Sequence, residues 1–142
     1  MITCVCAEKW THCGPMVIRV VAGLIFAMHG YQKLMGGVDA TAGFLSTLGF
    51  PIPVLFAVLL IAAELVGGLF LIVGAFTQWS AKILTFVSLV ALLTVHIKNG
   101  FFMATGGYEF ILLLLAACIS IVISGAGCWS ADAWWKNKNS QV

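Results

Sequence analysis

Four apolar stretches of about 20 residues each constrain this chain more than any other feature. They run over residues 15–35, 54–76, 79–97 and 108–126. A transmembrane helix needs about 20 apolar residues, because each residue advances about 1.5 Å across a hydrocarbon core roughly 30 Å thick. The stretches are too long for barrel strands, and an open sheet edge would leave unpaired backbone groups in lipid. The pattern predicts an all-α membrane protein, an antiparallel bundle of four transmembrane helices.

The composition excludes a soluble globular domain. The chain is 62% hydrophobic and only 8% charged, whereas soluble domains carry about 25% charged residues. Its net charge of +2 gives no basic surface of the kind that binds nucleic acid. We therefore expect lipid to solvate most of the surface, with the first apolar stretch acting as an uncleaved signal anchor.

The 142 residues suffice for one domain with two short tails. We divide the chain into a Cys-containing tail (1–14), a four-helix domain (15–128) and a C-terminal interfacial tail (129–142). The longest connection, residues 36–53, is expected to hold a short interfacial helix around residues 40–48. Small residues four apart, in Gly23-xxx-Ala27 and Ala63-xxx-Gly67, predict close helix contacts.

Basic residues predict the orientation in the membrane. Four spans place five of them on the side of the termini, against Lys33 and Lys98 on the other side. Because cytoplasmic loops carry an excess of Lys and Arg, we expect a multi-pass protein of the cell inner (plasma) membrane with both termini in the cytoplasm. Arg19 is expected to be an anchor at that face. The five on the terminal side are Lys9, Arg19, Lys82, Lys136 and Lys138.

Ionisable residues inside the spans are the candidates for function. Glu64 lies near the middle of the second stretch, and His29 and Lys33 share a face of the first. His96 ends the third stretch and Glu109 begins the fourth. Alternating topology brings these five residues into one half of the bundle. Because such groups are costly in lipid and usually face a partner or cavity, we predict a polar pocket there.

Two chemical roles suit that pocket, and structural roles compete with them. A carboxyl near two imidazoles can relay protons, and the same groups can hydrogen-bond a quinone carbonyl. Alternatively, Lys33, Lys98 and Glu109 reach the headgroups from helix ends, the histidines join helices through hydrogen bonds, and Glu64 holds helices in register.

The cysteines give a weaker signal. Cys4, Cys6 and Cys13, with His12 beside them, carry ligand types that bind zinc or copper. Their spacing matches no strong metal motif, so we predict no metal site and an unstructured tail. Cys118 is expected to be an inert apolar residue, and Cys128 an interfacial residue open to S-acylation.

Several polar and glycine-rich segments resemble the DoxX family of small bacterial membrane proteins. They are residues 28–34 (MHGYQKL), 63–68 (AELVGG), 71–77 (LIVGAFT) and the stretch from His96 to Glu109, and the similarity extends over about residues 17–126. Gln78 stands where the family usually has a basic residue, with Lys82 one turn later. The resemblance implies a four-helix membrane bundle linked to quinone-dependent redox complexes.

The leading hypothesis is therefore an accessory subunit of a quinone-linked membrane oxidoreductase complex, without an intrinsic cofactor and with quinone as a ligand. Its partners would be other membrane redox subunits or further copies of the chain. The alternatives are a non-catalytic structural or assembly subunit, and an oligomeric small-molecule carrier.

Overall fold

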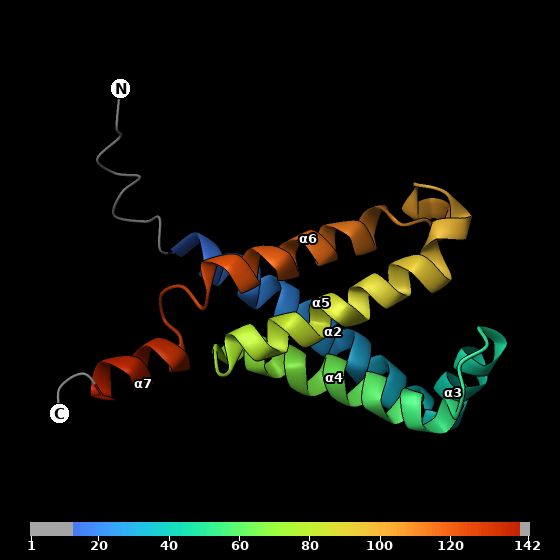
Figure 1. Cartoon of the computed structure of the whole chain (residues 1–142), viewed down its shortest axis with the longest axis horizontal. Helices are drawn as coiled ribbons and strands as arrows, with labels where there is room; N and C mark the ends of the chain where they lie inside the picture. The colour runs from blue at the N-terminus through green and yellow to red at the C-terminus, as the bar shows by residue number, and fades with distance from the viewer. Residues whose placement is uncertain (1–12, 140–142) are drawn as a thin grey trace.

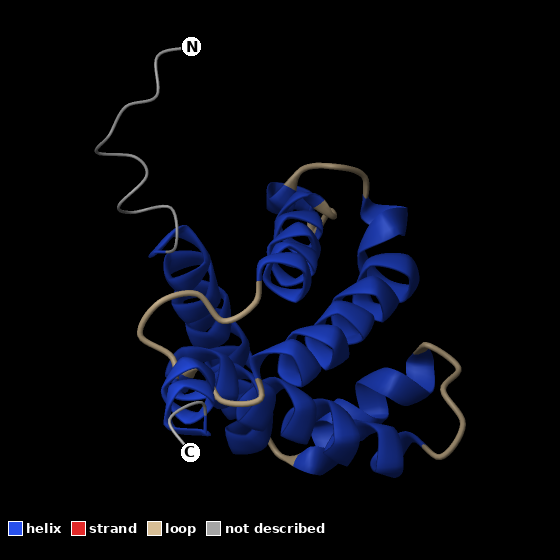
Figure 2. Ribbon diagram, turned by 60° about the vertical axis from the view of Figure 1, so that its left-hand side comes forward, coloured by secondary structure: helices blue, strands red, loops and turns tan. Residues whose placement is uncertain are grey.

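The computed structural model describes residues 13–139, and helices form all of its regular structure in that range (Figure 1, Figure 2). Short connections join most of the helices, and the longer one between α5 and α6 contains three single helical turns of other types. In chain order the elements are α2 (Gly14–Gly36), α3 (Val38–Thr47), α4 (Pro53–Val73), α5 (Thr77–Ala91), the π-helical turn Leu92–His96, the 3₁₀ turns Ile97–Asn99 and Met103–Thr105, α6 (Glu109–Ser124) and α7 (Ala131–Asn139).

Within residues 13–139, three helical stretches are long and apolar enough to cross a membrane: Gly14–Gly36, Pro53–Val73 and Thr77–Asn99. They confirm the prediction of an all-α membrane protein. The fourth apolar helix, α6, has 16 residues and is therefore only about 24 Å long. That is shorter than the roughly 30 Å hydrocarbon core, so a fourth full crossing stays a prediction.

Successive apolar helices run in alternating directions (Figure 1). We call the end that holds the start of α2, the α4–α5 turn and α7 the terminal end. The opposite end, which holds α3 and the turn between α5 and α6, is the distal end. The short helix expected around residues 40–48 is present as α3, which packs against α4.

Glycines let α2 and α4 pack backbone against backbone. A Cβ added to Gly30 would lie 2.5 Å from the backbone nitrogen of Leu65, and one added to Gly68 would lie 2.5 Å from that of Ala27. The predicted close contact through Gly23 and Ala27 is therefore confirmed. Gly67 of the second predicted motif contacts a different helix, because a Cβ added to it would lie 3.4 Å from the Leu84 side chain of α5, whereas Gly68 faces α2.

In the described part of the chain, the buried apolar residues form two separate clusters. The larger one joins all four long helices, with Phe26 from α2, Leu71 from α4, Leu84 from α5 and Ile121 from α6. The smaller one joins Ala42 and Leu45 of α3 to Ala57 of α4 at the distal end. Glu64 follows Ala57 by two turns on the same helix, so the middle of α4 lies between the two clusters.

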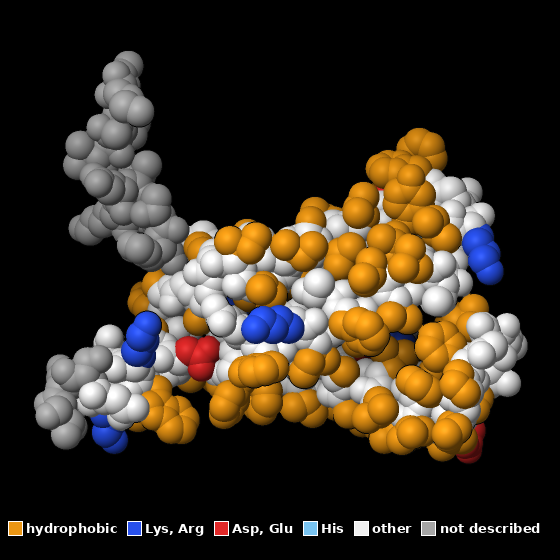
Figure 3. Space-filling view, in the orientation of Figure 1, with side chains coloured by type: hydrophobic (Ala, Val, Ile, Leu, Met, Phe, Trp, Pro, Cys, Tyr) orange, Lys and Arg blue, Asp and Glu red, His pale blue; other side chains and the backbone are white. Residues whose placement is uncertain are grey.

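The outer surface is mostly apolar, as Figure 3 shows for one face, where charged side chains are isolated patches. Large side chains such as Leu113, Phe86 and Ile123 are exposed by 67%, 67% and 80%. A water-soluble surface of this kind would aggregate, so lipid is its natural solvent. Four of the tryptophans lie at or next to the terminal end, where Trp and Tyr form interfacial belts: Trp79, Trp129, Trp134 and Trp135.

Candidate functional site

An ion pair between α2 and α4 is the central feature of the distal half. Lys33 Nζ donates a hydrogen bond of 2.5 Å to Glu64 Oε2. The Glu64 side chain is 9% exposed and that of Lys33 30% exposed. Glu64 is the twelfth of the 21 residues of α4, which places the carboxylate at mid-helix. A charge at this depth needs a partner, and Lys33 supplies it.

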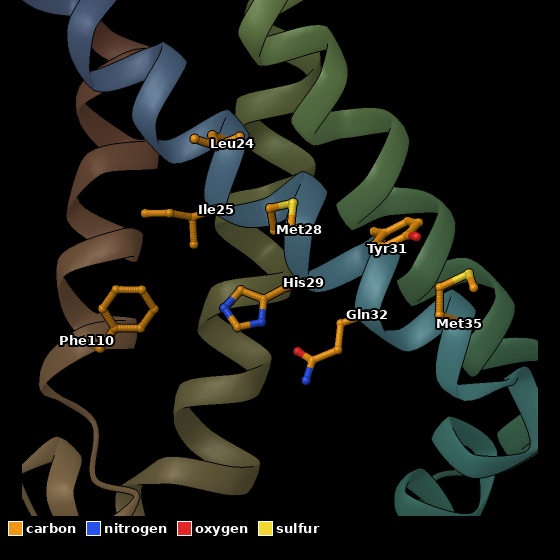
Figure 4. A pocket seen from close by; sticks show the side chains of 8 residues that line it. All are labelled: Leu24, Ile25, Met28, His29, Tyr31, Gln32, Met35 and Phe110. Atoms are coloured by element: carbon orange, nitrogen blue, oxygen red, sulfur yellow. The ribbon is translucent and has the colours of Figure 1, made fainter.

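An open groove runs along the same helix, α2. Its volume is about 740 Å³, within the range of small-molecule sites. His29 and Gln32 project from α2 toward the space beside α6, and Phe110 lies across from His29 (Figure 4). Both polar side chains are exposed. The lining residues are Leu24, Ile25, Met28, His29, Tyr31, Gln32, Met35 and Phe110.

His96 and Glu109 hold the turn between α5 and α6 in shape. His96 Nδ1 is 2.9 Å from the carbonyl oxygen of Gly106, and the backbone N–H of Met103 donates to Glu109 Oε1 over 2.8 Å. His96 ends a π-helical turn, which shifts the register of the helix before it enters the turn. Both side chains therefore satisfy backbone groups.

The five predicted site residues fall into two groups in the distal half. Lys33 and Glu64 are in direct contact, and His29 precedes Lys33 by one turn on α2. His96 and Glu109 bond to a different element, the turn after α5. Lys98 is exposed in that turn.

Arg19 is not the headgroup anchor that the sequence predicts. Its residue is 1% exposed, and Nη1 donates to the carbonyl oxygens of Leu71 and Ile72 over 2.7 and 3.1 Å. Nη2 donates to the carbonyl oxygen of Trp129 over 3.1 Å. The last carbonyls of α4 have no partner within the helix and carry its negative dipole end, so a buried guanidinium is stabilised there.

Asp132, a residue that sequence reasoning missed, completes this junction. Its carboxylate accepts hydrogen bonds of 2.9 Å from the backbone N–H groups of Phe76 and Thr77. Those are free donors at the start of α5, where an anionic cap is favourable. α7 thus caps α5, although 55 residues separate Asp132 from Thr77. No sequence signal pointed to Asp132, because Thr77 is itself a residue type that caps helices.

Three sulfur atoms meet at the terminal end. Cys128 Sγ lies 2.7 Å from Cys13 Sγ and 3.7 Å from Met16 Sδ. The contact with Cys128, followed by desolvation, raises the pKa of the Cys13 thiol above its ordinary value. Cys118 is fully buried in α6. Cys4, Cys6 and His12 lie outside the described residues, and residues 13–139 contain no group of three or more His, Cys, Asp or Glu side chains placed to hold a metal.

With the fold and these residues in place, comparison with known proteins gives the family. The DoxX family profile matches residues 14–97, which include α2, α4, α5 and the Lys33–Glu64 pair. The chain belongs to the DoxX family.

Individual relatives agree with this assignment. A Bacillus subtilis (strain 168) protein named "Putative oxidoreductase CatD" is 31% identical over 119 residues, 84% of each chain. An uncharacterized protein of Haemophilus influenzae is 30% identical over 128 residues, 88% of this chain and 92% of the relative. The "Inner membrane protein YphA" of Escherichia coli (strain K12) is 31% identical over 74 residues, 52% of each chain. No solved structure matches the chain.

Proposed function

We propose that this protein is an accessory subunit of a quinone-linked redox complex of the inner membrane, and that its distal half binds the quinone headgroup. The observation that carries the proposal is the proximity of two features on α2. One is the open groove lined by His29 and Gln32. The other is the intramembrane Lys33–Glu64 ion pair, one turn further along.

The groove suits a quinone in size, polarity and access. A quinone headgroup is a flat apolar ring with two carbonyl acceptors, and it carries a long apolar tail. Leu24, Met28 and Phe110 offer apolar and aromatic surface for the ring, while the His29 imidazole and the Gln32 amide can donate hydrogen bonds to its carbonyls. Because most of the lining residues are exposed on the lipid side, the tail can remain in the bilayer.

The Lys33–Glu64 pair gives the site a route for protons. Quinone reduction consumes protons, and the middle of a membrane contains no water to supply them. His29 and Lys33 are four residues apart on α2 and therefore share a face. In this proposal His29 hydrogen-bonds the ligand, and Lys33 and Glu64 hold the exchangeable proton behind it. The electrons come from a partner subunit, because the proposal gives this chain no redox group of its own.

The relatives and the apolar surface support a place for this protein in a redox complex of the inner membrane. One relative bears the name of an oxidoreductase and another that of an inner membrane protein. The excess of basic residues at the terminal end favours termini in the cytoplasm. The extensive exposed apolar surface offers area for partner subunits as well as for lipid.

Matched pairs of variants test the site. The purified protein is placed in nanodiscs, and binding of a short-tailed quinone is titrated by quenching of Trp fluorescence. We expect His29→Gln, which moves a proposed donor away from the ligand, to weaken binding by about 10-fold, the effect of losing one hydrogen bond of about 1.4 kcal/mol. Lys33→Gln, which changes a residue behind the ligand, should leave the affinity near that of the wild type. The controls are His96→Gln and Lys98→Gln, which change the same residue types in the distal turn. Equal affinity for all four variants would contradict the proposal.

A structural or assembly subunit is the second candidate, and one observation favours it. His96 and Glu109 were predicted to belong to the pocket, yet they bond to backbone groups of the distal turn. The exposed apolar faces would then be the functional surface. This candidate predicts that the protein co-purifies with membrane partners but binds no quinone, and that Glu64→Ala leaves electron transfer unchanged.

A further inference from the structure

A pair of cysteines at the terminal end is brought together from opposite ends of the chain. Cys13 precedes α2 and Cys128 lies between α6 and α7, 115 residues later. Their sulfur atoms are 2.7 Å apart, and both residues are only partly buried. Small reactants can therefore reach them, unlike Cys118, which is fully buried.

The position of Cys128 is fixed by its surroundings. Gly127 before it and Trp129 after it both have a positive φ, of 69° and 49°. A bulky residue rarely adopts this conformation unless its surroundings enforce it. Here Arg19 enforces the conformation of Trp129, because its guanidinium donates a hydrogen bond to the Trp129 carbonyl oxygen. Met16 Sδ also contacts Cys128, at 3.7 Å from its Sγ. The chain is thus held so that Cys128 meets Cys13.

The surroundings of the two sulfurs do not complete a metal site. A structural zinc ion takes four ligands, and residues 13–139 place no group of three or more His, Cys, Asp or Glu side chains there. The two sulfurs are in contact with each other, so one is placed to attack a disulfide formed by the other.

We propose that Cys13 and Cys128 form a reversible thiol–disulfide exchange site whose reactants are low-molecular-weight disulfides and thiols. Cytoplasmic disulfides are usually transient, catalytic or redox-sensing, and the predicted cytoplasmic side agrees with such a pair. The site is independent of the proposed quinone function, because Cys13 lies just before α2 and Lys33 follows it by 20 residues, roughly 30 Å along the helix.

The exchange balances without another oxidant. One of the two thiolates attacks a small disulfide RSSR, forming a mixed disulfide and releasing RS⁻. The thiolate of the second cysteine then attacks the protein sulfur of that mixed disulfide and releases the second RS⁻. The protein loses two electrons and two protons, and RSSR is reduced to two RSH. The new bond joins the start of α2 to the segment that carries Asp132, the cap of α5.

Redox titration of the full-length protein tests this proposal. The variant Cys4→Ser/Cys6→Ser/Cys118→Ala keeps only the two cysteines of interest. In detergent it is equilibrated with glutathione buffers of increasing oxidised fraction, and free thiols are trapped with a maleimide and mapped by mass spectrometry. Cys13→Ser in the same background is the matched control. The wild-type chain is titrated in parallel, with Cys118 as its internal control, so that the result does not depend on the variants folding.

We expect both thiols to disappear together and a peptide to appear that links Cys13 and Cys128 with the loss of two hydrogen atoms. Reduced glutathione should reverse this change. The Cys13→Ser control should instead stop at a mixed disulfide between Cys128 and glutathione. Three results would overturn the proposal: two thiols that remain free in excess oxidised glutathione, two that titrate independently and both end glutathionylated, or a bound stoichiometric metal that protects both.

Discussion

The charged side chains at the two ends of the bundle have different kinds of hydrogen-bond partner. At the terminal end, Arg19 donates to three carbonyl oxygens and Asp132 accepts from two backbone N–H groups. In the distal half, Lys33 and Glu64 bond to each other beside an open groove. Backbone partners cannot leave without local unfolding, whereas two side chains can separate and re-pair with a ligand. The partners of Arg19 and Asp132 therefore make these two charges structural, whereas the Lys33–Glu64 pair suits the role that we propose for the distal half.

The largest effect on stability is expected from Arg19→Met. The variant leaves the carbonyl oxygens of Leu71, Ile72 and Trp129 without their donor, and it releases the α6–α7 segment. Breaking a buried charged interaction of this kind typically costs about 3–5 kcal/mol, so little folded protein should be recovered. Thermal unfolding in detergent, followed by Trp fluorescence, measures the loss. The stability of Arg19→Lys should lie between that of the wild type and that of Arg19→Met, since the Lys ammonium lacks the planar fork of the guanidinium group. If Arg19→Met were as stable as the wild type, Arg19 would not be structural, and the contrast between the two ends would fail.

Gly30→Ala is expected to have the next largest effect. The new methyl group would lie 2.5 Å from the Leu65 nitrogen, so α2 and α4 must separate. Overpacking costs about 1–3 kcal/mol, and the separation should also disturb the Lys33–Glu64 pair. Gly43→Ala is the control, because nothing lies within 4 Å of its added Cβ and alanine favours the helix by up to about 1 kcal/mol. We predict that Gly30→Ala lowers the melting temperature and that Gly43→Ala raises it. Equal shifts for the two variants would contradict the backbone contact at Gly30.

Asp132→Ala should have a smaller effect, local to the start of α5. Loss of a helix cap costs about 1 kcal/mol, and it frees the N–H groups of Phe76 and Thr77. Hydrogen exchange should rise at these two amides and not at the start of α4. Asp39→Ala, which removes an exposed acid from the first turn of α3, serves as the comparison. Unchanged exchange at Phe76 and Thr77 would show that α7 does not cap α5.

The smallest effect on stability is expected from the distal ion pair. Because polar contacts between transmembrane helices typically couple by only about 0.6 kcal/mol, the coupling between Lys33 and Glu64 should be about 0.5–1 kcal/mol. A double-mutant cycle of Lys33→Met and Glu64→Gln in unfolding experiments measures it. A coupling as large as the cost of Arg19→Met would make this pair structural too, and the contrast between the two ends would fail.

The sequence predicted the helices well because hydrophobic length alone determines them in a membrane. The spans, the helix between residues 36 and 53, and the placement of Glu64 at mid-helix all follow from counting residues. The direct partner of Glu64 did not follow, because alternating topology gathers five ionisable residues without saying which pairs touch. Only the packing of the side chains shows that Lys33, and not His96 or Glu109, contacts Glu64.

The terminal end was harder to predict, for a reason visible in its residues. Arg19 reads as an interfacial anchor because it lies four residues inside the first span. Its burial depends on the carbonyls at the end of α4 and on the Trp129 segment, which no local pattern connects to it. The caps of α5 and the contact between Cys13 and Cys128 are likewise contacts between distant segments. Such contacts are set by the tertiary fold and leave little periodic signal.

The central claim, that the distal pair handles protons for a quinone, is tested most directly in the intact complex. The protein is purified from native membranes in mild detergent with its partners, and quinone-dependent electron transfer is compared for wild type and Glu64→Gln. The amide keeps the shape of the carboxylate but cannot exchange its proton. We predict a turnover at least about 10-fold lower, within the contribution of a positioned acid–base group, with the complex still assembled. Unchanged turnover in an assembled complex would contradict the account.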